Sequence, residues 1–454
     1  MLLGQDDGVA ITTLVERGEL SRAARSFLRT ESGSAVLLLV AALVALAWAN
    51  AGDTYERFWA VELSFDLGGA RLAEDLRHWV NDGLMVFFFF SVGLEISREA
   101  VMGELRGARA LIAPALAAVG GLAVPAGLYL LFTAGGPGAG AWGIAISTDT
   151  AVMLGVLALV GPRCPDQLRV FLLALAIVDD IGAVAAIAIF YTEDLQPTAL
   201  LLAAALFVAL LALRFARFWR TPLYVVIGVV MWVAVLESGV HPSVVGLVMG
   251  LLVNAYAPRA TDLQRAEVLG RSFAADPTPA RALAARSGFV DAVSPNERLQ
   301  LLVQPWSSYV VVPLFVLANA GVVLDAETLG AALRSPITHG IVAGLVAGKL
   351  LGVSAGTWVA LRTGLGRVPD TLRWGQLVGG AGLTGIGFTV ALFVTDLALD
   401  DPALQTQAKV GILTGSLLAG LVGWSIFRLL GERGGQCSPS GLPVLPPRPW
   451  RPPE

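Results

Sequence analysis

The stretch LLALAIVDDIGAVAAIAIF, from Leu172 to Phe190, decides how the rest of the sequence is interpreted. It is apolar and long enough to span a bilayer, and it carries two adjacent carboxylates, Asp179 and Asp180, at its middle. Placing an Asp at the centre of a membrane helix costs about 2.5–3.5 kcal/mol on insertion scales, so two in one span are rarely accidental. The stretch predicts a transmembrane helix that carries an ion site.

The composition supports a membrane location. The chain has 454 residues, of which 56% are hydrophobic and 15% charged, whereas a soluble domain has about 25% charged residues. This balance predicts a polytopic membrane protein. Basic residues are scattered over short loops without a continuous stripe, so nucleic-acid binding is not expected. Cys164 and Cys437 fall in segments predicted to be cytoplasmic, and no disulfide is expected.

Apolar stretches divide residues 34–430 into a predicted membrane domain of twelve transmembrane helices. Most stretches are close to the ~20 residues that a spanning helix needs. Their approximate bounds are 34–50, 79–101, 108–132, 141–161, 168–191, 197–215, 222–237, 240–256, 304–322, 338–361, 374–398 and 407–430. The fold class is therefore an all-α polytopic membrane protein.

Four segments lie outside the predicted spans or connect them. Residues 1–33 are predicted to be a polar cytoplasmic arm, and the Pro-rich residues 431–454 a disordered cytoplasmic tail. Residues 51–77 form a periplasmic loop, in which alternation before a Gly-Gly pair predicts a hairpin at Val61 to Leu72, with an irregular loop as the alternative. Residues 257–303 are predicted to be a cytoplasmic insertion with one or two short surface helices.

The distribution of basic residues predicts the orientation in the membrane. Of the 31 Lys and Arg residues, 25 lie in the N-terminal arm, the tail and the connections that follow even-numbered spans. The opposite side carries five, namely Arg57, Arg71, Arg77, Arg334 and Lys409. By the positive-inside rule both termini are cytoplasmic, which requires an even number of spans.

Two predicted spans carry signals of interruption. In WGIAISTDTAVMLGVLALVG, the fourth span, Asp149 is surrounded by the hydroxyls of Ser147, Thr148 and Thr150, which favour a break in the helix and supply oxygen ligands. The eleventh span, GGAGLTGIGFTVALF, contains five glycines, a density that weakens the continuity of a helix. Interrupted spans at corresponding places in two halves indicate inverted repeats, here spans 3–5 and 10–12, with the broken helices crossing at the site.

The charged residues predicted inside the spans are Asp82, Glu95, Asp149, Asp179, Asp180, Lys349 and Asp396. Lys349 is the most informative of these, because the chain has only two Lys among its 31 basic residues. A buried Lys can release its proton, whereas Arg remains charged at physiological pH. Lys349 is therefore predicted to be the partner of a carboxylate, the alternative being a side chain that extends to the interface.

Neighbouring positions on a helix diverge by about 100°, so Asp179 and Asp180 cannot face one ion equally. One carboxylate can coordinate a cation, while the other pairs with Lys349 or changes protonation. Hard monovalent cations prefer oxygen ligands. Asp149 and Lys349 suit the facing N-terminal and C-terminal ends of the broken helices. Competition between a cation and a proton for the same oxygens would then be the basis of exchange.

These residues resemble the bacterial NhaA-type sodium/proton antiporters. The matching motifs run in family order from the predicted second span to the eleventh: HWVNDGLMVFFFFSVGLEISRE (78–99), STDTAVMLGVLALVG (147–161), LALAIVDDIGAVAAIAIFYT (173–192), ESGVHPSVVGLVMG (237–250), PLFVLANAGV (313–322), AGKLLGV (347–353) and GIGFT (385–389). The resemblance implies electrogenic export of Na⁺, and also Li⁺, with two protons entering per ion, for pH and sodium homeostasis in the bacterial inner membrane. It implies no cofactor and no enzymatic activity.

The resemblance also implies roles for individual residues. Asp179 and Asp180 would bind Na⁺ and protons, with Asp149 and Thr148 beside them and Lys349 as the charge partner of Asp179. Further positions implied are Glu95 and Glu99 in a cytoplasmic funnel, Asp82 toward the periplasm, and Thr384, Gly385 and Gly387 in the interrupted eleventh span. The hairpin at 61–72 matches an outer element through which similar proteins pair, which predicts a homodimer.

The sequence departs from the family at the start of the predicted ninth span. Well-studied members carry a Glu and two His before a Pro-Trp, at positions associated with pH sensing. Here RLQLLVQPW places Gln300, Leu301 and Gln304 before Pro305 and Trp306. None of the three can titrate, so a shifted pH response, or one set by the transport site alone, is expected. The insertion at 258–299 is also atypical of the family.

Three other classes are less consistent with these residues. An intramembrane aspartyl protease also needs two membrane aspartates, but IVDD and STDTA lack the G-x-G-D motif of such enzymes, and a proton-sharing dyad would not need Lys349. A cation channel would carry rings of charge rather than a single buried Lys. A symporter of similar build would move both ions in the same direction, which a transport assay distinguishes.

Overall fold

The structure, a computed structural model, describes residues 31–67, 70–102, 108–160, 166–192, 195–216, 221–256, 259–368 and 372–430. Helices fill most of these residues, and the strands they contain form one two-stranded sheet. Most of the predicted N-terminal arm, the tail and both cysteines lie outside the described residues. Helix α2 (Glu31–Ala49) begins within the predicted arm.

One to three consecutive helical segments lie at each of the twelve predicted spans. After α2 these are η1 (Trp79–Leu84) with α5 (Met85–Met102), α6 (Ala108–Thr133), α7 (Gly143–Ile146) with α8 (Thr150–Val160), α9 (Asp166–Phe190), α10 (Pro197–Phe215), α11 (Thr221–Leu236), α12 (Ser243–Leu252), α15 (Pro295–Trp306) with η4 (Ser307–Val311) and α16 (Val312–Asn319), α18 (Pro336–Ala343) with η5 (Gly344–Gly348) and α19 (Lys349–Arg362), α20 (Trp374–Leu383) with α21 (Phe388–Ala398), and α22 (Pro402–Leu430). The short connecting helices are α3 (Thr54–Trp59), α4 (Leu76–His78), η3 (Ala139–Trp142) and α17 (Ala326–Arg334).

The lengths of these helices support a polytopic membrane protein. Among the described residues, six helices are long and apolar enough to cross a membrane, and two bent pairs raise that number to eight. Apolar helices at Gly33–Ala49, Pro222–Leu236 and Ser243–Leu252 are shorter. The span predicted at 240–256 is therefore too long, because its helix has ten residues and rises about 15 Å. The number of twelve spans stays a prediction.

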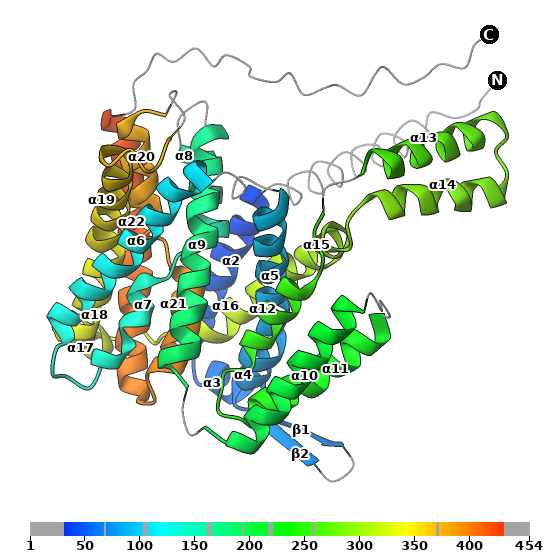
Figure 1. The fold of residues 1–454 in the computed structure, drawn as a ribbon. Coiled ribbons are helices and arrows are strands. Elements are labelled where there is room, and N and C mark those ends of the chain that lie inside the picture. Colours follow the sequence, from blue (N-terminus) through cyan, green and yellow to red (C-terminus); the bar gives the residue numbers. More distant parts are fainter. Residues whose placement is uncertain are drawn as a thin grey trace, which may run out of the picture.

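The predicted hairpin forms at one end of the molecule. Strands β1 (Glu62–Leu67) and β2 (Ala70–Asp75) pair antiparallel, with Leu67 opposite Ala70 at the turn and Glu62 opposite Asp75 at the base. The hairpin thus extends beyond the predicted end at Leu72. Figure 1 shows it at the end of the helical assembly opposite to helices α13 (Ala260–Ala275) and α14 (Pro279–Ala292).

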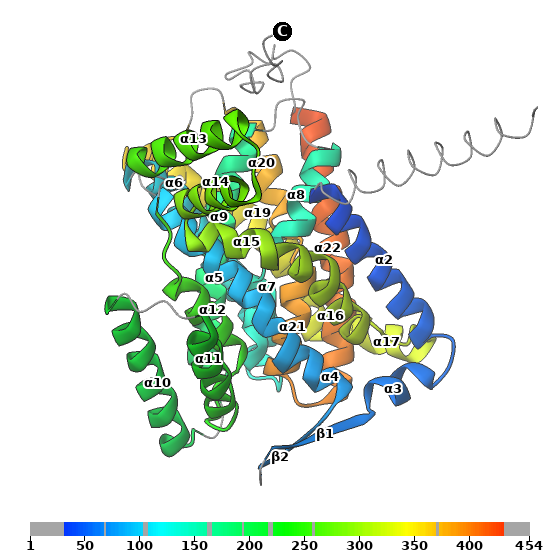
Figure 2. The same cartoon turned by 90° about the vertical axis from the view of Figure 1, so that its right-hand side faces the viewer.

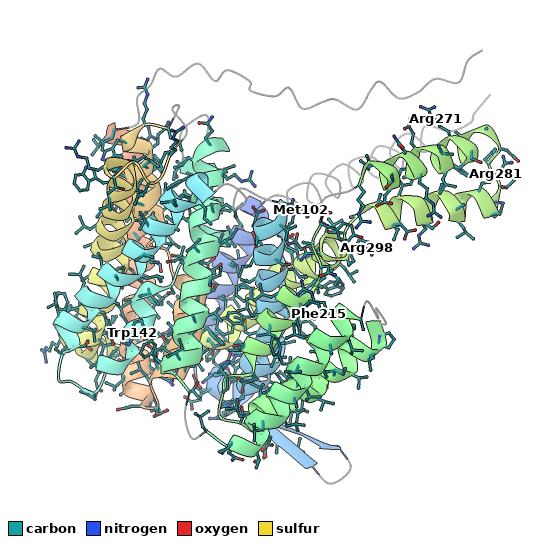
Figure 3. All side chains as sticks on the ribbon, viewed as in Figure 1. Met102, Trp142, Phe215, Arg271, Arg281 and Arg298 are labelled. Carbon is teal, nitrogen blue, oxygen red and sulfur yellow. The ribbon has the colours of Figure 1, made fainter. Side chains whose placement is uncertain are left out.

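The segment predicted to be an insertion with one or two short helices contains two helices, α13 and α14. They pack side by side through Gly288, whose Cα faces Leu269 and Ala266, and they project away from the other helices with Arg271 and Arg281 toward the far end (Figure 3). Helix α15 begins at Pro295, before the predicted end of the insertion at 303. Ser294 caps it by accepting a bond from the Glu297 N–H at 3.3 Å, so the helix starts well before the apolar run.

Glycines allow two pairs of helices to pack with their backbones in contact. A Cβ at Gly120 of α6 would lie 2.1 Å from the carbonyl oxygen of Gly352 in α19. A Cβ at Gly246 of α12 would lie 2.1 Å from the carbonyl oxygen of Val86 in α5. Close approach through small residues is a main source of helix association in membranes. The first contact fixes α19, and with it Lys349, against α6.

Helices α10 and α11 lie at the periphery (Figure 2). With α12 they form a separate hydrophobic cluster that includes Leu210, Met231 and Val245. The larger clusters lie among the helices that surround the two bent pairs.

The contact between α6 and α19 can be tested by adding one methyl group. We expect Gly120→Ala to lower the stability by about 1–3 kcal/mol, because overpacking forces the two backbones apart. Gly127→Ala is the matched control on the same helix, since its Cβ would meet nothing within 4 Å. The thermal unfolding midpoint of the purified protein measures both. Equal midpoints for the two variants would contradict the close packing.

Candidate functional site

The two bent helix pairs meet at their breaks. Residues 147–149 separate α7 from α8, and the segment formed by η3 and α7 is bent by 43° relative to α8. Residues 384–387 separate α20 from α21, and these two helices are bent by 44°. The predicted interruptions of the fourth and eleventh spans are therefore confirmed. In both cases the break falls on the residues that the sequence pointed to.

Each break satisfies polar groups of the other. The N–H of Asp149 donates to the carbonyl of Ile386 at 2.6 Å, and the hydroxyl of Thr148 donates to the carbonyl of Thr384 at 2.9 Å. The hydroxyl of Ser147 lies 3.3 Å from the carbonyl oxygen of Gly387. Unpaired backbone groups are costly in an apolar interior, so these reciprocal bonds allow non-helical backbone there.

Two glycines make this crossing possible. A Cβ at Gly385 would lie 2.0 Å from the carbonyl oxygen of Leu345 in η5, and one at Gly387 would lie 2.6 Å from the carbonyl oxygen of Ser147. No side chain fits at either position. The glycines that signalled an interruption thus also permit the close approach of three backbone segments.

Asp149 is placed between two helix N-termini. Its Oδ1 accepts from the Val152 N–H of α8 at 3.0 Å, and its Oδ2 accepts from the Thr389 N–H of α21 at 3.2 Å. The side chain is buried. A carboxylate at this point compensates the partial positive charges of both helix ends, as the sequence predicted for Asp149.

Asp179 of α9 and Lys349 of α19 form a buried ion pair. The Nζ of Lys349 lies 2.6 Å from Oδ2 of Asp179, and the side chains are 0% and 1% exposed. This hydrogen bond is the one that Lys349 makes among the described residues. Among the described residues, Lys349 therefore makes no hydrogen bond to the C-terminal ends of α7 and α20, whose partial negative charges it was predicted to compensate. The other carboxylate oxygen of Asp179, Oδ1, is buried and has no hydrogen-bond partner in the part of the chain described.

Asp180 points to a different environment. Its side chain is only half-buried, and the structure gives it no hydrogen bond or ion pair within the described ranges. It interacts electrostatically with Asp179, Glu95, Lys349 and Asp149. An unpaired carboxylate beside a paired one is the division that the 100° divergence between neighbouring positions predicts.

The remaining predicted residues lie along α5 and η1. Glu95 is among the electrostatic neighbours of Asp180. Glu99, one turn further, lies 3.9 Å from Arg98, which is also 3.9 Å from Glu297 of α15. Asp82 lies at the opposite end of this helical segment and faces His241, with 3.2 Å between Oδ1 and Nε2.

The structure also shows where the residues that depart from the family pattern lie. Gln300 lies on α15, where its Nε2 is buried without a hydrogen-bond partner among the described residues, and Leu301 is exposed. Asn296, one turn before Gln300, is buried and donates to the carbonyl of Leu94 at 3.0 Å. The Asn296 hydrogen bond thus connects α15 to α5 next to Glu95, beside the charged Arg98–Glu297 contact.

Sequence reasoning missed a second polar cluster nearer the hairpin. It consists of Asn81, Asn319, Asp396 and Lys409, from η1, α16, α21 and α22. Lys409 was counted among the basic residues outside the membrane, but α22 begins at Pro402 and buries it. The signal that could have identified it is the scarcity of lysine, which also singled out Lys349.

Buried carboxylates and a buried ammonium at the crossing of two broken apolar helices define a membrane ion transporter. The chain matches the Na⁺/H⁺ antiporter 1 family over residues 25–427, and it belongs to that family. It is 49% identical over 440 residues to Na(+)/H(+) antiporter NhaA 3 of Frankia alni, which covers 96% of this chain and 95% of the relative. The family resemblance inferred from the motifs is confirmed.

Two further relatives are longer than this chain. Na(+)/H(+) antiporter NhaA 1 of Salinispora arenicola is 49% identical over 406 residues, covering 89% of this chain and 62% of the relative. Na(+)/H(+) antiporter NhaA 1 of Mycolicibacterium gilvum is 44% identical over 430 residues, covering 94% and 70%.

The double capping by Asp149 can be tested by removing its carboxylate. Asp149→Ala leaves the N–H groups of Val152 and Thr389 without acceptors, and each buried unsatisfied group costs about 1–3 kcal/mol. We expect a clearly lower thermal midpoint in Na⁺-free buffer. Thr150→Val is the neighbouring control, because the Thr150 hydroxyl is buried without a partner among the described residues. An unchanged midpoint in Asp149→Ala would contradict the capping role.

Proposed function

We propose that this member of the Na⁺/H⁺ antiporter 1 family exports Na⁺, and also Li⁺, in exchange for protons that enter the cell. The exchange serves pH and sodium homeostasis in the bacterial inner membrane. The observation that carries the proposal is the carboxylate of Asp180, which has no ion-pair partner among the described residues and lies beside the Asp179–Lys349 ion pair. A transporter of this kind needs no cofactor and catalyses no covalent reaction.

Cation and proton compete for the same oxygens in this scheme. Asp180 binds either a proton or the cation, because one carboxylate in a half-buried position cannot hold both. A cation that also approaches Oδ1 of Asp179 repels the ammonium of Lys349, which then gives up a proton. Thr148 is a side-chain neighbour of Asp179, and its hydroxyl proton is committed to the Thr384 carbonyl, so its oxygen is free to face the cation.

This competition supports electrogenic exchange. Binding of one cation displaces one proton from Asp180 and one from the Asp179–Lys349 pair. The return step carries two protons inward for each Na⁺ that leaves, so one net charge enters the cell per cycle. Asp149 stabilises the crossing and lies beside the cation.

The same proposal includes twelve spans, with spans 3–5 and 10–12 as inverted repeats and both termini in the cytoplasm. Two bent pairs with nearly equal angles support the repeats. The opposite positions of the hairpin and the α13–α14 insertion (Figure 1) support an orientation with the hairpin in the periplasm. Glu95 and Glu99 then line the cytoplasmic approach, and Asp82 lies toward the periplasm.

We further propose a homodimer through the hairpin. In the described residues, β1 and β2 pair only with each other, so each strand has an outer edge that no other strand covers. Such an edge is a ready template for pairing with another strand.

The pH response is proposed to arise at the transport site. Gln300, Leu301 and Gln304 cannot titrate, and the neighbouring Asn296 holds α15 to α5 through a neutral hydrogen bond. Protons then regulate the transporter by competing with the cation at Asp180.

The direction of coupling tests the proposed function. In everted vesicles with an acidic lumen, added Na⁺ should release protons from the lumen, and Asp180→Asn should abolish this release because an amide can neither bind the proton nor balance the cation. Protein amount and thermal midpoint serve as controls for folding. Movement of Na⁺ and protons in the same direction would overturn antiport, and wild-type release in Asp180→Asn would place the ion site elsewhere.

Lys349→Arg tests whether Lys349 must release its proton. Arginine keeps the positive charge opposite Asp179 but stays protonated at physiological pH. We expect a folded variant that has lost electrogenic exchange, measured as Na⁺-driven charge movement in proteoliposomes. Retained charge movement would assign Lys349 a structural role.

A further inference from the structure

A second buried pair of opposite charges lies away from the transport site. Lys409 of α22 faces Asp396 of α21, and its side chain is 9% exposed. Lys349 and Lys409 are the two lysines of the chain, and every other basic side chain apart from three His is Arg. Both lysines are buried, and each faces an aspartate on another helix. The two positions therefore share a requirement for a compact ammonium.

The second pair is much looser than the first. Lys409 Nζ lies 3.8 Å from Asp396 Oδ1, compared with 2.6 Å between Lys349 and Asp179. A separation of 3.8 Å exceeds hydrogen-bond range. The other oxygen of Asp396, Oδ2, accepts from Asn81 Nδ2 at 3.1 Å. One oxygen of the Asp396 carboxylate thus accepts a hydrogen bond, and the other has, among the described residues, only an ammonium at 3.8 Å.

Amide oxygens extend this cluster. Asn81 Oδ1 accepts from Asn319 Nδ2 at 2.7 Å, and that same NH₂ group also donates to the Phe315 carbonyl at 3.0 Å. The Oδ1 of Asn319 has no hydrogen-bond partner among the described residues, although the side chain is fully buried. A buried acceptor without a donor is expensive. A cation near this amide would satisfy it.

The cluster lies between the transport site and the hairpin. Helix α21 starts at the crossing, where the Thr389 N–H donates to Asp149, and Asp396 follows seven residues later, a rise of about 10 Å. Asn81 lies in η1, which α4 joins to the hairpin (Figure 2). An ion that travels from the crossing toward the hairpin would meet Asp396 on this route.

We propose that Asp396, Asn81 and Asn319 form a second, transient site for the transported monovalent cation. When no cation is bound there, the ammonium of Lys409 compensates the negative charge of Asp396. This inference rests on the proposed antiport. One carboxylate with amide oxygens suits Na⁺ or Li⁺. A transition metal would need more, and the described residues contain no group of three or more His, Cys, Asp or Glu placed to hold a metal.

The test is the apparent affinity for Na⁺ measured separately from each face of the membrane. Right-side-out and everted vesicles present the two faces, and the variants are Asp396→Asn, Lys409→Gln and the control Asp400→Asn. Asp400 is exposed and lies four residues from Asp396. Asp400→Asn therefore removes the same negative charge at a position outside the cluster. Thermal midpoints confirm that each variant is folded.

The two cluster variants should act in opposite directions. We expect Asp396→Asn to raise the apparent KM for Na⁺ about tenfold from the hairpin face, because a carboxylate near the cation is lost. From the opposite face its KM should stay within about twofold of wild type, since the Asp179–Asp180 site is intact. Lys409→Gln should lower the KM from the hairpin face, because the competing ammonium is gone. Asp400→Asn should behave as wild type on both faces.

Three results would overturn the second site. These are a wild-type KM for Asp396→Asn on both faces, an equal rise on both faces, or a higher KM for Lys409→Gln from the hairpin face. The last two indicate a structural ion pair. If the wild type shows no Na⁺-driven proton movement, the proposed function fails instead. Suppose that the wild type exchanges Na⁺ for protons and Asp180→Asn does not. An Asp396→Asn variant with a wild-type KM on both faces then refutes the second site and leaves the proposed antiport intact.

Discussion

The need to satisfy backbone polar groups in an apolar interior determines how the centre of this protein is built. Breaks at 147–149 and 384–387 leave N–H and C=O groups without helical partners, and such groups cost several kcal/mol each in hydrocarbon. The two breaks solve the problem together, because Asp149, Thr148 and Ser147 bond to the opposite segment. The crossing that results creates helix ends, and those ends require the compensating carboxylate of Asp149.

The charges of the site follow from this geometry and from the period of a helix. Asp179 and Asp180 diverge by about 100°, so Lys349 can neutralise one and leave the other open. A fully paired site would bind no cation, and a site with two free carboxylates would be too costly to bury. In the proposed exchange, one buried ion pair and one half-buried carboxylate let a cation replace protons without leaving charge uncompensated.

Much of this arrangement could be predicted from the sequence, because apolar runs, hydroxyls and glycines report on local structure. The positions of the helices, both breaks, the hairpin and the partner of Asp179 were accessible in this way. The start of α15 was not, since the Ser294 cap extends the helix beyond its apolar part. The cluster around Asp396 was also missed, because Asn81 lies 315 residues from Asp396 in the sequence, and only the fold brings them together.

The contacts between helices differ in how easily they can be exchanged. The pairs α6–α19 and α5–α12 are joined by glycines with backbone against backbone, so separating them would expose tightly packed surface to lipid or water. By contrast, η1 meets α21 through the Asn81–Asp396 hydrogen bond, and α22 faces α21 through the 3.8 Å Lys409–Asp396 pair. Water or a cation can replace such polar contacts at little cost. The glycine-packed pairs are therefore harder to separate than η1 and α21, whose contact combines exchangeable polar groups with the apolar cluster that contains Val80 and Phe393.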